Sequence, residues 1–300
     1  MKILASVVTY NRLELLKRCF THIQSQSRAP DEILIIDNKS TDGTESYFNQ
    51  GICKYIRQEN LGSSGGWNTA IRYAQQNGFD AIWLMDDDGF PDKDALLELE
   101  RNISLKHSCI SSIVLCEDNK DRFVFPFPKI SKHGLPSLFS FPRKFEKLSI
   151  LNSSNSSKEY PFVNLFNGAL IRVSSTKAIG NVNTDYFMFG DEVDYFFRLR
   201  KVGIVSSLKA AKHYHPDVTK RPLTKVKIYY YLRNSIILNK KYFNFYLIRS
   251  FFNIIAIMLR VPLRNGFLNF FSLFFGSLRE AFFLGIIHGF WNKIHDKPFR

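Results

Sequence analysis

The N-terminal third of the chain alternates short apolar runs with segments of helical spacing. Continuous apolar runs that contain β-branched residues are typical of buried strands. The predicted strands are Ile3–Thr9, Glu32–Asp37, Lys54–Arg57 and residues 81–85. The predicted helices are Leu13–Gln24, a short helix after the turn at residues 40–43, and residues 66–77. Strands that alternate with helices predict a doubly wound α/β sheet, in which ligands bind outside the carboxyl ends of the strands.

The regular pattern weakens after a predicted helix at residues 95–105. Residues 117–160 are rich in Pro, Phe, Ser and Lys, which predicts a long, partly mobile insertion that serves as a binding loop. Regular structure resumes at residues 165–173, and a helix is predicted to begin after Gly190. We therefore expect one α/β domain over residues 1–217 and a separate C-terminal region over residues 218–300.

The C-terminal region is basic and rich in Phe. It holds 14 Lys and Arg, two acids and 13 of the 29 Phe, whereas residues 1–217 carry 27 basic and 25 acidic side chains. An apolar series with i, i+3, i+4 spacing predicts an amphipathic helix. The series is Phe267, Phe270, Phe271, Phe274, Phe275, Leu278 and Phe282. Two interpretations stay open: a helix packed on the α/β domain, or a helix that lies on a membrane surface between flanking cations.

The net charge of +14 and the 45% apolar content limit the classes to which the protein can belong. Disorder is excluded by the apolar content, and four Cys without Cys-x-x-Cys spacing favour a reducing compartment. A basic nucleic-acid-binding protein is the distant alternative function. No nucleic-acid partner is expected, because the aromatic residues form a stripe instead of alternating with basic residues. We expect neither a signal peptide nor a membrane span, since uncharged stretches of the tail fall short of the roughly 18–20 apolar residues required.

Asp86, Asp87 and Asp88 follow the last predicted strand of the N-terminal third. Three adjacent carboxylates repel one another, so ionising all of them is costly. A divalent cation would relieve this repulsion, and hard ions such as Mg²⁺ prefer carboxylate oxygen and often bridge to phosphates. The alternative is a solvated acidic turn. We favour a metal site because the cluster ends a strand.

Three other motifs could contribute to a site, and the first two have two interpretations each. Asp191, Glu192 and Asp194 follow an apolar segment that ends at Gly190, so they could supply a general base or cap the N-terminus of a helix. His215 precedes a proline and is predicted to lie with His213 in a loop, as a metal ligand or as an ordinary histidine. The glycines of residues 60–68 allow close approach to a ligand, but the segment is neither Walker A nor GxGxxG.

Taken in order, the motifs of residues 1–216 resemble those of family 2 glycosyltransferases with the GT-A fold. The matching segments are residues 7–12 (VVTYNR), 36–44 (IDNKSTDGT), 60–62 with Gly65 and Gly66, 83–89 (WLMDDDG), 167–169 (NGA), 190–194 (GDEVD) and His215 with Pro216. The resemblance implies a mixed, Rossmann-like sheet flanked by helices. The tail, with residues 229–234 (YYYLRN), looks like the helical C-terminal region of bacterial members that act on lipid-linked glycans.

The resemblance also implies roles for the matched residues. The nucleotide sugar would be bound by Thr9, Tyr10, Arg12, Asp37, Asn60, Gly65, Gly66, Trp67, Asp86 and Asp87, with Gly65, Gly66 and Trp67 shaping the sugar pocket. A divalent metal, Mn²⁺ or Mg²⁺, would be held by Asp86, Asp88 and His215. Glu192 would be the catalytic base, although a slip of one residue in the match would give this role to Asp191. Asp194 would orient the site.

The implied activity is that of an inverting, metal-dependent glycosyltransferase of bacterial surface polysaccharide synthesis. The aspartate triplet and the Gly-Gly-aromatic stretch look most like the galactofuranosyl- and rhamnosyltransferase branch. The expected donor is UDP-galactofuranose, with dTDP-rhamnose as the alternative, and the acceptor would be a glycan or a lipid-linked glycan that meets residues 117–160. The enzyme would be cytoplasmic and peripheral on the inner face of the cell membrane, with a homo-oligomer as one option. A nucleotidyltransferase, which can also use paired Asp and a metal, is the alternative enzyme.

Overall fold

The computed structural model describes residues 1–132, 134–219 and 221–299. The chain forms two compact units. The first contains Met1–Val182 and Tyr195–Asp217, and the second contains Asn183–Asp194 together with the chain that follows Asp217. The expected domain of residues 1–217 included Asn183–Asp194. In the structure this segment instead belongs to the second unit, because α8 (Lys225–Tyr242) binds its main chain and Asp194.

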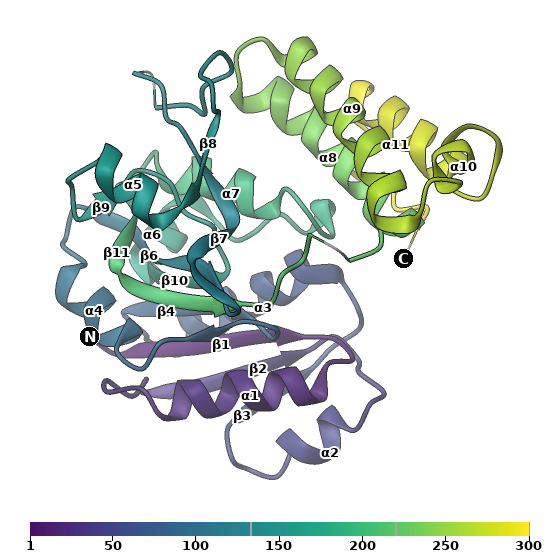
Figure 1. The fold of residues 1–300 in the computed structure, drawn as a ribbon. Coiled ribbons are helices and arrows are strands. Elements are labelled where there is room, and N and C mark those ends of the chain that lie inside the picture. The colour runs from purple at the N-terminus through teal and green to yellow at the C-terminus, as the bar shows by residue number, and fades with distance from the viewer. Residues whose placement is uncertain (133, 220, 300) are drawn as a thin grey trace. The chain divides into compact units, whose positions relative to one another are not determined.

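The first unit is built on one mixed sheet (Figure 1). Its order is β3-β2-β1-β4-β10-β6-β11-β5, with β7, β8 and β9 off this path. The strands are β1 (Ile3–Thr9), β2 (Glu32–Asp37), β3 (Lys54–Arg57), β4 (Ala81–Asp86), β5 (Phe90–Pro91), β6 (His107–Cys116), β7 (Asn119–Pro128), β8 (Lys144–Lys147), β9 (Glu159–Tyr160), β10 (Asn167–Arg172) and β11 (Ile204–His215). Strands β1 to β4 pair in parallel, whereas β10 is antiparallel to both of its neighbours. The predicted mixed sheet is confirmed.

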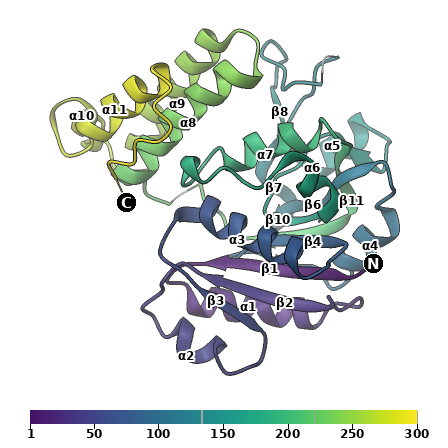
Figure 2. The ribbon, with the colours of Figure 1, turned by 180° about the vertical axis from the view of Figure 1, so that it is seen from behind.

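Helices cover both faces of this sheet, as the two opposite views show (Figure 2). They are α1 (Leu13–Gln24), α2 (Thr44–Phe48), α3 (Gly62–Gln76), α4 (Ala95–Asn102), α5 (Leu148–Ser154), α6 (Val173–Ile179) and α7 (Asp191–Leu199), the last of which continues from one unit into the other. Successive side chains of a strand point to opposite faces. On β1, Ile3 and Val7 therefore join the cluster of α1 and α4, and Leu4 and Val8 join the cluster of α3.

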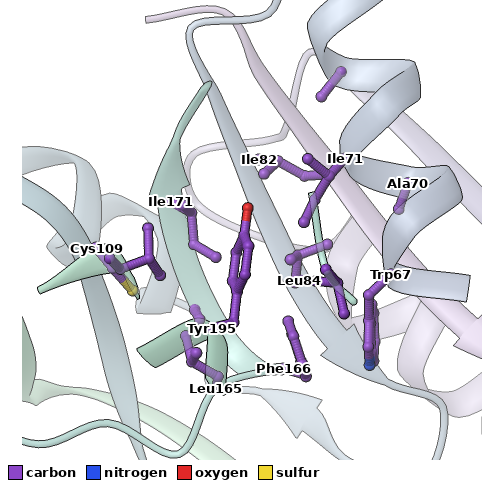
Figure 3. Close-up of a cluster of buried hydrophobic side chains, with 14 of the residues drawn as sticks. Trp67, Ala70, Ile71, Ile82, Leu84, Cys109, Leu165, Phe166, Ile171 and Tyr195 are labelled. Atoms are coloured by element: carbon purple, nitrogen blue, oxygen red, sulfur yellow. The ribbon is translucent and has the colours of Figure 1, made fainter. Parts of the chain in front are cut away.

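Helix α3 begins earlier than the predicted helix of residues 66–77. The helix begins at Gly62, so Gly65 and Gly66 are helical. A Cβ atom on Gly66 would lie 2.4 Å from Cγ1 of Val8, so glycine allows α3 to lie directly on β1. Trp67 is 1% exposed and stacks on Phe166 with ring centroids 4.6 Å apart (Figure 3). These residues close the core, and the role of Trp67 in a sugar pocket stays a prediction.

Residues 117–160, apart from the undescribed residue 133, are more regular than the expected mobile insertion. Strand β7 pairs with β6 and β8, and α5 and β9 follow. Phe123 and Phe127 are buried and stack with centroids 4.7 Å apart, and Phe127 also stacks on Tyr160. These aromatic side chains form a hydrophobic cluster of their own, so much of the segment has regular structure that its composition did not predict. Its role as an acceptor loop stays a prediction.

The second unit is helical. Its helices are the 3₁₀ helix η1 (Thr184–Tyr186), α8 (Lys225–Tyr242), α9 (Tyr246–Asn265), α10 (Asn269–Phe275) and α11 (Arg279–Phe290), together with the first residues of α7. The predicted single apolar stripe from Phe267 to Phe282 is broken, because α10 and α11 are bent by 63° around a break that contains Gly276. Leu273 and Phe282 are buried with α8 and α9, whereas Phe271 and Phe275 are exposed.

Helix α9 differs from the expectation that the tail has no membrane span. It has 20 residues, a mean hydropathy of 1.5 over its most apolar window, and only 17% of that window is buried. By length and composition alone it could cross a membrane, and the bent pair α10 and α11 passes the same test together. The sequence-based estimate missed α9 because it ended each apolar stretch at an arginine, and the helix continues through Arg249 and Arg260.

Candidate active site

Four polar side chains lie where strands of the first unit end. Thr9 ends β1, Asp37 ends β2, Asp86 ends β4 and His215 ends β11. Thr9 is in register with Asp37, and Val8 is in register with Asp86. The carboxyl ends of β1, β2 and β4 therefore bring Thr9, Asp37 and Asp86 to one edge of the sheet, the edge at which ligands bind in open α/β sheets.

The acidic cluster that follows β4 is crowded. Asp87 and Asp88 are each 3% exposed, and Asp86 is partly buried. Burial, followed by the charges of Asp88 and Asp87, raises the pKa of Asp86 to about 8. Burial also raises the pKa of Asp87 against the opposing effect of Arg12. The cluster is therefore not a solvated acidic turn, and it favours a bound cation.

The carboxylate of Asp87 accepts hydrogen bonds from two side chains that precede α1 in the sequence, those of Thr9 and Arg12. The hydroxyl of Thr9 donates to Oδ2 at 2.8 Å, and a guanidinium nitrogen of Arg12 donates to Oδ1 at 2.9 Å. The same nitrogen of Arg12 lies 3.0 Å from Oδ2 of Asp88. Burial acts to lower the pKa of Arg12, but the charges of Asp87 and Asp88 outweigh burial, so the net pKa of Arg12 is raised. The structure thus joins Thr9, Arg12 and the aspartates, as the sequence predicted for one site.

His215 completes this cluster. Its Nε2 lies 2.9 Å from Oδ1 of Asp88, and its Nδ1 lies 2.7 Å from the carbonyl oxygen of Pro216. That carbonyl can only accept, so Nδ1 carries a hydrogen and Nε2 faces the carboxylate. Burial lowers the pKa of His215, but the hydrogen bond and charge of Asp88 outweigh it, and the net pKa is raised. The residue lies at the end of β11 and not in the expected loop.

His213 lies two residues earlier on β11 and is buried beside the same cluster. It is fully buried, and a Cβ on Gly89 would lie 2.3 Å from its Nε2. Neither of its ring nitrogens has a hydrogen-bond partner within the described part of the chain. Burial, followed by the charge of His215, lowers the pKa of His213 to about 3. Its imidazole is therefore neutral.

Asp37 is fully buried and held by its own partners. Its carboxylate accepts from the main-chain N–H of Ser40 at 2.8 Å and from the hydroxyl of Tyr55 at 2.5 Å, and Nε of Arg57 lies 3.9 Å away. Burial and the bond to Asp37 raise the pKa of Tyr55. Tyr55 and Arg57 were not among the predicted site residues. Their position on β3, the strand beside β2, was the available signal.

Arg18 was also missed. It lies on α1, where one nitrogen donates to the carbonyl of Asp88 at 3.0 Å and another to Glu117 at 2.8 Å.

The remaining predicted binding residues differ in their exposure and contacts. Tyr10 is 48% exposed directly after β1, and the side chain of Asn60 accepts from the N–H of Gly62 at the start of α3. Gly66 allows α3 to pack on β1, as described above, whereas a Cβ atom on Gly65 would lie 2.3 Å from Cβ of Leu61, just before the helix.

The remaining predicted acids belong to the second unit. Glu192 is partly exposed, and its Oε2 accepts from the N–H of Gly190 at 2.8 Å. Asp191 is 2% exposed. The carboxylate of Asp194 is held by Lys241 at 2.7 Å and by the hydroxyl of Tyr242 at 2.6 Å. Capping by Glu192 is thus present, and the carboxylate of Asp194 is held by α8.

The donor set after β4 suits a hard divalent cation. No group of three His, Cys, Asp or Glu among residues 1–132, 134–219 and 221–299 is arranged as a preformed metal cluster. However, Asp88 and His215 place a carboxylate oxygen and an imidazole nitrogen 2.9 Å apart, with Asp86 two positions earlier. Oxygen and imidazole donors of this kind are ligands that Mg²⁺ and Mn²⁺ accept.

Known proteins identify the family. Residues 5–153 match the family model described as glycosyl transferase family 2. The chain is 32% identical over 219 residues to galactofuranosyltransferase GlfT1 of Mycolicibacterium smegmatis, covering 71% of this chain and 70% of that protein. It is 30% identical over 223 residues to GlfT1 of Mycobacterium tuberculosis, with the same coverage. This chain belongs to glycosyltransferase family 2.

Solved structures agree on the fold. The mannosyltransferase PcManGT of Pyrobaculum calidifontis, solved in complex with GDP-Man and Mn²⁺, superposes with a TM-score of 0.57 at 15% identity, covering 97% of this chain and 88% of that one. S. aureus TarS residues 1–349 give 0.52 at 14% identity, covering 98% and 82%. The GT-A fold predicted from the motifs is confirmed, and the protein is a glycosyltransferase.

The bond between Thr9 and Asp87 makes a testable contribution to stability. Thr9→Val keeps the shape of the side chain but removes a donor from a buried carboxylate, which should lower the free energy of unfolding by about 1–2 kcal/mol. Chemical denaturation of the full chain measures this change. Ser6→Ala is the matched control on β1, because the buried hydroxyl of Ser6 has no partner in the described structure. Equal losses from both variants would contradict the assignment.

Proposed function

We propose that this glycosyltransferase moves galactofuranose from UDP-galactofuranose to a glycan or lipid-linked glycan with inversion at the anomeric carbon. The observation that carries the donor is the similarity to GlfT1 proteins, at 30–32% identity over 71% of this chain. The site supports a diphosphate-linked donor, because Arg12 and the acidic cluster gather at the carboxyl edge of the sheet. Bacterial surface polysaccharide synthesis is the process in which we place the enzyme.

Asp86, Asp88 and His215 would hold a divalent metal, Mn²⁺ or Mg²⁺. When bound, such a metal supplies positive charge against the diphosphate leaving group. Thr9 and Arg12 keep Asp87 in place beside these ligands. The bond from Nδ1 of His215 to the carbonyl of Pro216 fixes the orientation of the ring and directs Nε2 toward Asp88. Asp37, Tyr55 and Arg57 form the adjoining part of the nucleotide-binding edge.

Glu192 is proposed as the general base that removes the proton from the acceptor hydroxyl. Its partial exposure and its hydrogen bond to Gly190 support this choice, while the nearly complete burial of Asp191 makes that residue the second choice. One base and one direct displacement give an inverted product. General-base catalysis of this kind contributes about 10²–10⁴-fold to the rate.

The second unit is proposed to lie on an anionic membrane through α9 and α10, at the cytoplasmic face. Large apolar side chains of this surface are exposed: Ile248, Phe251, Phe252, Leu259, Leu263, Phe267, Leu268, Phe271 and Phe275. Arg249, Arg260 and Arg264 lie on the same helix, which contains no acidic residue. An apolar surface bordered by arginines suits anionic lipid, and a lipid-linked acceptor would be found there.

The donor and the base can be tested in one assay with a lipid-linked glycan acceptor. UDP-galactofuranose should support transfer with an inverted linkage, and Glu192→Gln should lose about 10²–10⁴-fold in kcat while donor affinity is kept. Glutamine can still accept the bond from Gly190, so the capping contact survives. Product analysis and calorimetric donor binding measure the two effects.

Other results would redirect this assignment. Faster transfer from dTDP-rhamnose would replace the donor. Near-normal turnover by Glu192→Gln combined with an inactive Asp191→Asn would move the base to Asp191.

The metal proposal predicts a specific change in the response to Mn²⁺. Asp88→Asn should shift the Mn²⁺ concentration for half-maximal activity by more than about tenfold, because it removes a charged ligand. Enzyme treated with EDTA and then titrated with Mn²⁺ gives this midpoint. Glu117→Gln is the matched control, since Glu117 pairs with Arg18 and is not a proposed ligand. An unchanged midpoint for Asp88→Asn would refute the role of Asp88.

The membrane proposal can be tested by flotation of the full chain with vesicles that contain phosphatidylglycerol. Wild type should float, and Leu259→Glu with Leu263→Glu should stay in the bottom fraction, because two charges replace exposed apolar side chains of α9. The control carries Leu105→Glu and Phe141→Glu, which make the same change of charge at exposed apolar positions of the first unit. Equal flotation of the two double variants would rule out the α9 surface.

A further inference from the structure

The segment that leads to Asp191 and Glu192 has an unfavourable backbone. Phe187 has a φ of 63° and Phe189 a φ of 57°, and Gly190 follows with a φ of 97°. Left-handed conformations are rare for bulky L-residues, and they persist where the surrounding structure holds them. Residues 187–190 therefore need contacts that compensate for this conformation.

Asn234 of α8 supplies these contacts. Its side-chain nitrogen lies within hydrogen-bond distance of three main-chain carbonyl oxygens, those of Tyr186 at 3.0 Å, Met188 at 2.8 Å and Phe189 at 2.5 Å. The residue is 1% exposed, so water does not compete for its amide. A single buried side chain thus bonds to the carbonyls on both sides of the strained residue Phe187.

Arg233, the preceding residue, reinforces this arrangement. Its Nε donates to Oδ1 of Asn234 at 2.8 Å, which leaves the amide nitrogen of Asn234 directed at the segment. Another nitrogen donates to the carbonyls of Asp185 at 2.7 Å and Tyr186 at 3.3 Å. Arg233 is fully buried and forms no ion pair within the described residues, and its guanidinium lies 4.7 Å from the ring centre of Tyr230. Burying a cation without a carboxylate is costly, so its bonds to the main chain have to compensate.

The following turns of α8 bind the other end of the segment. A Cβ atom on Gly190 would lie 2.7 Å from Cδ1 of Leu238 and 3.1 Å from Cβ of Asn234, so the chain passes close to the helix there. Lys241 and Tyr242 then hold the carboxylate of Asp194. The pair Asp191 and Glu192 lies between these two anchored points.

We propose that Arg233 and Asn234 are positioning residues for catalysis, which hold residues 185–190 so that the carboxylate that follows Gly190 is placed for proton transfer. This inference rests on the proposed function of Glu192 or Asp191 as the base. Neither Arg233 nor Asn234 touches substrate in this assignment. Their effect is on turnover and not on donor binding.

The test compares two asparagines of the same helix in the full-length enzyme. Asn234→Ala removes the bonds to residues 186–189, whereas Asn239→Ala removes a buried bond to Ser250 that does not involve this segment. We expect Asn234→Ala to lower kcat by about 10²-fold, the scale of a misplaced catalytic group, with the donor KM within about threefold of wild type. Asn239→Ala should keep kcat within about threefold. Arg233→Lys, a point charge in place of the planar fork, should behave like Asn234→Ala.

Hydrogen–deuterium exchange of the peptide that covers residues 184–192 provides a readout that does not depend on the reaction. Exchange should rise in Asn234→Ala and stay at the wild-type level in Asn239→Ala. Unchanged exchange in Asn234→Ala, or a kcat within threefold of wild type, would overturn the proposal, as would equal losses of kcat in both asparagine variants. If Glu192→Gln and Asp191→Asn both keep full turnover, the base assignment fails and the proposed placement of a carboxylate for proton transfer fails with it, whereas the exchange result still reports separately whether Asn234 holds residues 184–192.

Discussion

Asp86, Asp87 and Asp88 leave β4 in succession, and their repulsion has to be offset for the first unit to fold around them. The compensating groups come from elements far apart in the sequence. Thr9 and Arg12 flank the end of β1, and His215 ends β11. The β1, β4 and β11 strands therefore have to end near one another. The same requirement gathers the groups that the proposed donor and metal would contact, so the stability of this edge and its chemistry depend on the same residues.

The cations of the C-terminal region serve different purposes according to their burial. Arg233 is buried and donates to main-chain carbonyls, and Lys241 pairs with Asp194. Arg249 and Arg260 lie on α9 among exposed apolar side chains. The net charge of +14 is thus not a single patch. Removing the chain after Asp217 would delete the proposed membrane surface together with the side chains that hold residues 185–194, so point variants are the sharper experiments.

Much of the first unit could be predicted from local patterns. The bounds of β1, β2 and β3 and of α1 agree with the predicted ranges, because buried parallel strands and amphipathic helices have distinct periodicities. The early start of α3 and the pairing of β7 with β8 were not predicted, because their local composition does not favour regular structure. Glycine and proline disfavour regular structure locally, but the close approach to Val8 and the stacking of Phe123 on Phe127 outweigh that tendency.

The sequence by itself determined the order of the motifs, the family they resemble and the residue types of the site, since these depend on identity and spacing along the chain. Only the tertiary structure decided how each of these residues is used. It buries Trp67 and His213, pairs Asp37 with Tyr55, and brings Arg233 to the carbonyls of residues 185 and 186. Periodicity reports which side of an element is buried, but it does not identify the partner. Contacts such as Arg233 with Asp185 join distant segments, and they form only when those segments pack together.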